Sequence, residues 1–81
     1  EFLKNLSEKD TELYNAIKQW RNSTAEKENI APYMIFGDKT IEELVEKKPA
    51  SEKELLSVFG IGTVKAEKIG APALRIIGNH I

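Results

Sequence analysis

Apolar residues recur at helical spacing along most of this 81-residue chain, and glycine or proline interrupts the pattern where one apolar run gives way to the next. Side chains three and four positions apart share one face of an α-helix, so this spacing predicts amphipathic helices with one buried stripe each. The apolar stretch 30–36 lacks that spacing, and a strand there would have no partner. The sequence therefore predicts an all-α fold, a compact bundle of five helices.

The longest predicted helix covers residues 8–28. Its buried stripe includes Leu13, Ile17 and Trp20 at helical spacing. Ser7 precedes it and can cap the free amide groups of the first turn, while Asn29 tolerates the left-handed conformation that ends many helices.

The chain starts without a methionine, which suggests an excised piece of a longer protein. We therefore expect residues 1–7 to be a linker or a remnant, and residues 8–81 to be the domain. A chain of this length supports one compact core.

Residues 30–36 contain Pro32 and end at Gly37, so this stretch is expected to be extended and pinned onto the core. A second helix should follow, with Asp38 as its N-cap, and should end before Pro49.

The sequence Ser51-Glu-Lys-Glu54 is a capping box that predicts the start of a third helix. Gly60-Ile61-Gly62 should end it in a tight turn, with Thr63 capping the helix that follows. That fourth helix should end at Gly70, and Pro72 should open the fifth, because proline is favoured in a first helical turn.

Charge argues against a polybasic nucleic-acid clamp, because 12 basic and 13 acidic residues give a net charge of −1. The distribution is uneven, however. Within residues 60–81, Lys65, Lys68 and Arg75 outnumber Glu67, whereas acids predominate in residues 31–59. An anion-binding site is therefore expected in the C-terminal part of the chain.

The residues that usually carry catalysis are scarce. There is no cysteine, and the lone His80 has no nucleophile or second metal ligand beside it. Glu42 and Glu46 would share a helical face, which we interpret as solvated surface rather than a cation site. The glycine turn lacks the third glycine of a dinucleotide-binding fingerprint, and there is no phosphate loop. We expect no catalytic site, metal site or cofactor in this domain, and the composition favours an intracellular protein without a membrane span.

The stretch from Leu55 to Ile69 resembles a helix-hairpin-helix motif, with apolar residues, then Gly60-Ile61-Gly62, then a helix with alanine on its packed face. Two glycines allow the backbone to approach a phosphate, the isoleucine fills the core, and the next helix presents free N–H groups. Lys65 and Lys68 could add positive charge. Alternatively, the turn is only a compact connector between packed helices.

A wider set of residues extends this resemblance over about residues 11–81. It comprises Leu13, Ile17, Trp20-Arg21, Ile30-Ala-Pro-Tyr-Met-Ile-Phe36, Asp38-Lys-Thr-Ile-Glu-Glu-Leu44, Pro49 and Glu54-Leu-Leu-Ser-Val-Phe-Gly-Ile-Gly62. This pattern resembles the helicase-and-RNase-D C-terminal (HRDC) domain, most closely the copy in bacterial RecQ-family helicases. The proline-tyrosine-phenylalanine segment is its most specific part, because glycine hairpins recur in many DNA-repair folds.

The resemblance implies a non-catalytic, monomeric accessory domain of an ATP-dependent DNA helicase, in which the helicase core would use ATP and Mg²⁺. It implies weak binding of single-stranded or junction DNA, contact with the helicase core of the same chain, and a place in the bacterial cytoplasm at the nucleoid. The residues that would bind nucleic acid are Tyr33, Lys39, Gly60, Ile61, Gly62, Thr63, Lys65 and Lys68.

Two other functions stay open. An acidic surface at Glu42, Glu43 and Glu46 would suit docking on a basic partner, such as the helicase core, better than DNA. The same fold could also be the RNA-binding accessory domain of an RNase D-like exoribonuclease.

Three side chains have competing interpretations. Tyr33 fits base stacking and also fits a core position with its hydroxyl at the surface. Arg21 is expected to be structural, either paired with a carboxylate or capping a loop. Trp20 is expected to pack in the core, and the alternative is an exposed indole that stacks on bases.

Overall fold

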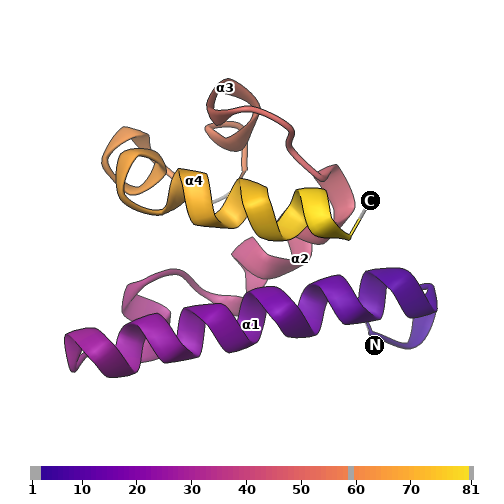
Figure 1. The fold of residues 1–81 in the computed structure, drawn as a ribbon, viewed down its shortest axis with the longest axis horizontal. Coiled ribbons are helices and arrows are strands. Elements are labelled where there is room, and N and C mark those ends of the chain that lie inside the picture. Colours follow the sequence, from indigo (N-terminus) through magenta and orange to yellow (C-terminus); the bar gives the residue numbers. More distant parts are fainter. Residues whose placement is uncertain (1–2, 59, 81) are drawn as a thin grey trace.

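The computed structural model describes residues 3–58 and 60–80. Within them it contains four α-helices, two short 3-10 helices and no β-strand (Figure 1). The elements are η1 (Leu3–Asn5), α1 (Glu8–Glu28), η2 (Pro32–Met34), α2 (Asp38–Lys47), α3 (Glu52–Leu55) and α4 (Thr63–Asn79). The all-α class is confirmed, but the described part of the chain has four α-helices rather than the five predicted.

The helices α1 and α4 run in opposite directions along the length of the molecule, so both ends of the chain lie at the same end (Figure 1). α1 packs against α2, η2 and α4, and α3 packs against α4. One hydrophobic core joins these elements, with Leu13, Ile17 and Phe36 among its most buried side chains.

Both predicted caps of α1 are present. The Ser7 hydroxyl oxygen accepts a hydrogen bond of 3.1 Å from the amide of Asp10, which satisfies one free donor of the first turn. Asn29 ends the helix at φ 59°, and its amide donates to the carbonyl oxygen of Ala25.

Residues 30–36 were predicted to be extended, but they contain the short helix η2. Pro32 opens η2, since its fixed φ suits a first helical turn, and the chain then buries Ile35 and Phe36. The segment is therefore pinned onto the core, as expected, by the residues that follow the turn.

The N-caps of two helices differ from prediction by one residue. Gly37 rather than Asp38 caps α2, because the Asp38 carboxylate lies in the first turn and bonds to another side chain. Gly62 rather than Thr63 caps α4, without a side-chain hydrogen bond.

The predicted capping box at α3 forms with one change of partner. The Ser51 hydroxyl oxygen accepts from the amide of Glu54 at 3.2 Å. The Glu54 carboxylate accepts from the amide of Ala50 at 2.9 Å, one residue before the expected donor.

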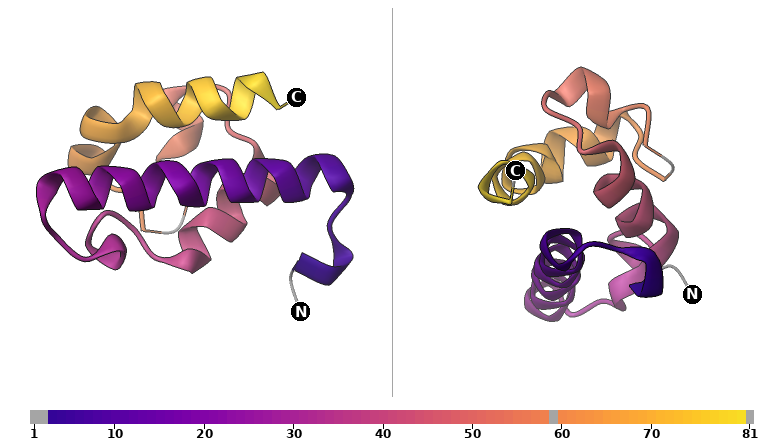
Figure 2. Two further views of the ribbon diagram at one scale, coloured as in Figure 1. Left: turned by 60° about the horizontal axis from the view of Figure 1, so that its bottom comes forward. Right: turned by 90° about the vertical axis from the view of Figure 1, so that its right-hand side faces the viewer.

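The predicted fourth and fifth helices are one helix. α4 runs through Gly70 and Pro72 without ending, and it changes direction between its first and last turns (Figure 2). Proline lacks an N–H and its ring crowds the preceding turn, so it bends a helix that packing holds together. Gly70 is buried, and a Cβ added there would lie 3.5 Å from Cδ2 of Leu55, so α4 packs closely on α3 at this position.

Near the N-terminus, η1 precedes Leu6, whose side chain packs against the core. The domain boundary after residue 7 remains a prediction. Phe59, which belongs to the hairpin stretch, and Ile81, the last residue of the predicted domain, lie outside the described residues.

Candidate nucleic-acid interface

Tyr33 projects from η2 and is 74% exposed. Ile35 and Phe36 directly behind it are buried, so the backbone that carries the ring is attached to the core. This excludes the core interpretation of Tyr33 and leaves its ring accessible from solvent.

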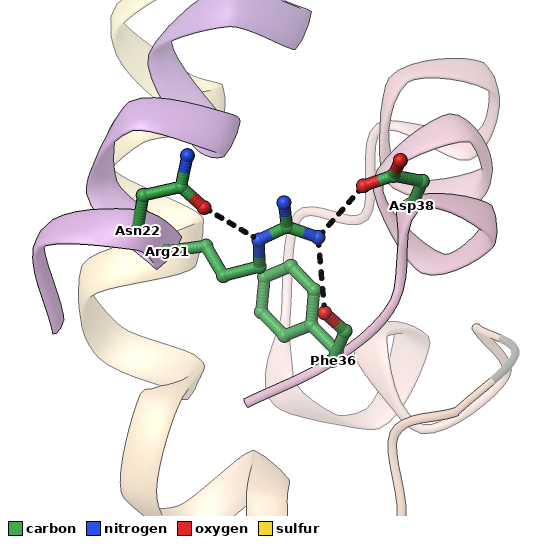
Figure 3. A network of polar contacts seen from close by, with 4 residues as sticks. All are labelled: Arg21, Asn22, Phe36 and Asp38. Atoms are coloured by element: carbon green, nitrogen blue, oxygen red, sulfur yellow. Dashed lines mark hydrogen bonds and ion pairs between the residues drawn. The ribbon is translucent and has the colours of Figure 1, made fainter. Parts of the chain in front are cut away.

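Arg21 holds the segment that carries Tyr33 (Figure 3). Its Nη1 donates to the carbonyl oxygen of Phe36 at 3.1 Å and to Oδ1 of Asp38 at 2.8 Å, and its Nε donates to Oδ1 of Asn22 at 3.1 Å. Arg21 is only 5% exposed, although it carries a charge. The expectation that Arg21 is structural is confirmed, since one guanidinium joins α1 to the start of α2.

The ring of Trp20 lies against this same segment. Its centroid is 5.9 Å from that of Phe36, with the two planes inclined by 46°. Trp20 is partly buried and packs against the core, so its expected packing role is confirmed, but part of its surface stays accessible.

Burial, together with the nearby carboxylates of Asp38 and Glu42, raises the pKa of Tyr14 above its ordinary value of 10.0, while the charge of Arg21 opposes the shift. These groups favour the neutral phenol. Tyr14 is therefore a buried side chain close to the charges of Arg21, Asp38 and Glu42. Tyr33, by contrast, lies on the exposed side of residues 30–38.

The glycine hairpin rests on the first turn of α2. Gly60 has φ 84°, and a Cβ added there would come within 2.5 Å of Oγ1 of Thr40. Only glycine allows this backbone conformation and this close approach. Lys39 is exposed and precedes Thr40 in the sequence.

The four predicted hairpin residues do not present the same groups. Ile61 is 4% exposed, so it fills the core as expected and offers only its backbone. Gly60, Gly62 and Thr63 are exposed. A ligand would therefore meet main-chain atoms and the Thr63 side chain here.

The first turn of α4 is electropositive. It has no acidic residue and no capping side chain, and Lys65 and Lys68 follow within it and one turn later. Free N–H groups at a helix start favour anions, and lysines add to that field. Among residues 3–58 and 60–80, no carboxylate pairs with either lysine.

A groove that the sequence did not predict lies where α1, η2 and the first half of α4 meet. Its volume is about 510 Å³, and it is lined by Trp20, Thr24, Glu28, Ile30, Met34, Ile35, Val64, Lys65, Lys68, Ile69 and Pro72. It places Lys65 and Lys68 around the same hollow as Met34, the neighbour of Tyr33. The sequence held one signal that could have indicated the α1 wall of this groove. Trp20, Thr24 and Glu28 recur every four residues and so share one face of α1.

The acidic residues considered for docking differ in availability. Glu43 pairs with Lys47 of the same helix at 3.3 Å, and Glu42 is half-buried near Tyr14. Glu46 is exposed. The acidic face of α2 is thus partly neutralised by its own lysine.

His80 lies at the end of α4, where its Nδ1 is 2.9 Å from the carbonyl oxygen of Ile76. In the described ranges, no three acidic, histidine or cysteine side chains gather as a metal site. None of the helices described is both long and apolar enough to span a bilayer.

Comparison with known proteins identifies the family. The HRDC domain family matches residues 10–77. The chain is 37% identical over 71 residues to the ATP-dependent DNA helicase RecQ of Haemophilus influenzae, covering 88% of this chain and 12% of the relative. It is 34% identical over 66 residues to RecQ of Bacillus subtilis, covering 82% and 11%.

A helicase with another name contains a similar segment. The ATP-dependent DNA helicase UvrD2 of Mycobacterium tuberculosis is 35% identical over 68 residues, covering 84% of this chain and 10% of the relative. The chain therefore spans about a tenth of the length of these relatives. The resemblance carried by the proline-tyrosine-phenylalanine segment is confirmed, and the chain belongs to the HRDC domain family.

Proposed function

We propose that this domain is the accessory nucleic-acid-binding module of a RecQ-type ATP-dependent DNA helicase, and that it binds single-stranded or junction DNA weakly. The observation that carries the proposal is the 74% exposed Tyr33, held on an anchored turn beside the groove that Lys65 and Lys68 line. The helicase core of the parent chain would supply the ATP- and Mg²⁺-dependent chemistry, in the bacterial cytoplasm.

An exposed aromatic ring on a fixed backbone suits the stacking of an unpaired base, a contact worth about 1–3 kcal/mol. Lys39, Lys65 and Lys68 would contact phosphates, together with the backbone of residues 60–63. About two or three phosphate contacts support a dissociation constant on the order of 10⁻⁴ to 10⁻⁶ M. Attachment to a helicase raises the effective concentration to about millimolar, so weak binding suffices.

The proposal is tested by titrating the ¹⁵N-labelled domain with a short oligothymidylate at low salt. Chemical-shift changes should gather at Tyr33, Lys39 and residues 60–68 and should fade as salt is added, with a log–log slope of about −2. Tyr33→Ala and Lys65→Glu should each weaken binding about tenfold without lowering the thermal midpoint.

Lys9→Glu is the matched control, because Lys9 is exposed in the first turn of α1, at the end of that helix far from the groove. It makes the same charge change as Lys65→Glu and should alter affinity much less. Equal losses for the two variants, or no shifts at millimolar oligonucleotide, would reject the proposed surface. Stronger shifts with the matching oligouridylate would instead favour the RNA-binding alternative.

A further inference from the structure

The groove between α1, η2 and α4, here called the α1–α4 groove, has no role of its own in the function proposed above. Its aliphatic lining comes from Ile30, Met34, Ile35, Val64, Ile69 and Pro72, and among the described residues Trp20 is the one aromatic side chain that lines it. Val64 is 71% exposed and Met34 is also exposed, so apolar surface faces solvent at its mouth. This volume of about 510 Å³ is within the range of sites that hold small ligands or side chains.

The charges along the groove are asymmetric. Lys65 and Lys68 line the α4 side and form no ion pair within residues 3–58 and 60–80. The first turn of α4 adds the positive end of a helix that has no acidic residue there. Glu28, the one acidic lining residue in the described part of the chain, belongs to the last turn of α1. An occupant should therefore place negative charge toward α4.

We propose that the α1–α4 groove is a docking site for an acidic peptide segment of a partner protein. The segment would insert one or two large apolar side chains among the aliphatic residues and set its carboxylates against Lys65 and Lys68. Aliphatic walls favour apolar side chains, whereas unpaired bases bind by stacking on aromatic or guanidinium planes. For this reason the lining fits a peptide better than a nucleobase.

This assignment also links the groove to the proposed nucleic-acid surface, and only this part rests on that function. Lys65 and Lys68 would serve both ligands, so peptide and oligonucleotide should compete. The domain would then be released from DNA when an acidic partner docks. Tyr33 does not line the groove and Val64 is not among the nucleic-acid residues, so each ligand can be weakened alone.

Trp20 provides the readout, because it is the only tryptophan in the chain and it lines the groove. The probe is a capped heptapeptide with a central leucine–phenylalanine pair flanked by aspartates, which contains no tryptophan or tyrosine. Its addition should change the Trp20 emission saturably, with a dissociation constant on the order of 10⁻⁴ M. The same peptide with two alanines at its centre should bind at least about tenfold more weakly.

Protein variants separate the two ligands. Val64→Ser removes exposed apolar surface and should weaken the peptide about fivefold while leaving oligothymidylate affinity unchanged. Tyr33→Ala should weaken oligothymidylate binding and leave the affinity for the peptide unchanged. A double change of Lys65 and Lys68 to glutamine should weaken both ligands about tenfold, whereas Lys9→Gln should affect neither.

The proposal fails if the heptapeptide gives no saturable signal at millimolar concentration, or if the dialanine peptide binds equally well. It also fails if oligothymidylate rather than peptide shifts the amides of Ile30 and Ile69, which line the groove, since the groove would then hold a base. Failure of the proposed nucleic-acid function is a separate result, the loss of oligonucleotide binding with peptide binding retained.

Discussion

Two connectors carry four of the eight predicted nucleic-acid residues, and they are held in different ways. Residues 30–37 are held by a side chain, since buried Arg21 bonds to Phe36 and Asp38 from α1. Residues 56–58 and 60–62 are held by backbone shape, since Gly60 adopts φ 84° against Thr40. In both connectors an apolar residue, Phe36 or Ile61, is buried in the core.

The difference predicts how each connector fails. The first depends on one guanidinium that bonds to several groups at once, so losing it leaves the buried Phe36 carbonyl without this donor. The second depends on a conformation that a single methyl group disturbs, so the damage should be local and smaller. Three measurements test this contrast.

Arg21→Met should have the largest effect. It removes the buried cation but keeps an apolar stem, and it leaves the Phe36 carbonyl without the donor that Arg21 supplies. Breaking a buried pair typically costs about 3–5 kcal/mol, but the Asp38 side chain is 58% exposed and can regain water. We expect a loss of about 2–3 kcal/mol in the free energy of unfolding, measured by urea denaturation.

Arg75→Met is the control for this change, because Arg75 is exposed on α4 and should tolerate it within about 0.5 kcal/mol. Arg21→Lys keeps the charge but not the planar guanidinium. Its loss in the free energy of unfolding should therefore lie between those of Arg21→Met and Arg75→Met. If Arg21→Met were as mild as Arg75→Met, the guanidinium would not be what holds residues 30–37.

Gly60→Ala should cost about 2 kcal/mol, because an L-residue is strained at this positive φ and its Cβ would collide with the Thr40 hydroxyl. Gly62→Ala is the matched change two residues later. Gly62 has φ −98°, and apart from its chain neighbours no atom of the described residues lies within 4 Å of the place that an alanine Cβ would take, so about 0.5 kcal/mol is expected for the altered N-cap. Thermal melts of both variants measure the difference, and equal midpoints would remove the special role of Gly60.

Tyr14→Phe should have the smallest effect, a change in how the stability of the domain depends on alkaline pH. Because the pKa of folded Tyr14 is raised, the unfolded chain loses this proton first as pH passes 10.0. The resulting stability is complete below that pH and is lost above it. Relative to the wild type, Tyr14→Phe should therefore show a shallower fall in thermal midpoint between about pH 9 and 11.

Tyr33→Phe is the comparison for Tyr14→Phe, because its ring is 74% exposed and lies on the outer side of the same connector. Its midpoint should follow the wild-type pH dependence. If the thermal midpoint of Tyr14→Phe fell with pH as steeply as that of the wild type, burial and the carboxylates of Asp38 and Glu42 would not be stabilising the neutral phenol.

The local signals in the sequence were sufficient for the elements whose ends are set by nearby groups. The Ser7 and Asn29 caps of α1, the stripe of α2 and the start of α3 at Ser51 all appear as predicted. Caps and helical stripes depend on residues within a turn or two, so one sequence window contains them. The HRDC family could also be recognised from the sequence, because its motif residues occur in a characteristic order and spacing.

The tertiary structure decided the features that depend on distant partners. Gly70 and Pro72 are local signals for a helix end, yet packing of α4 on α3 and α1 continues the helix and converts the break into a bend. Tyr33 fitted both a core and a surface position until Ile35 and Phe36 took the buried places. The α1–α4 groove is lined by residues far apart in the chain. It depends on how three elements pack against one another, which the sequence of a single segment does not determine.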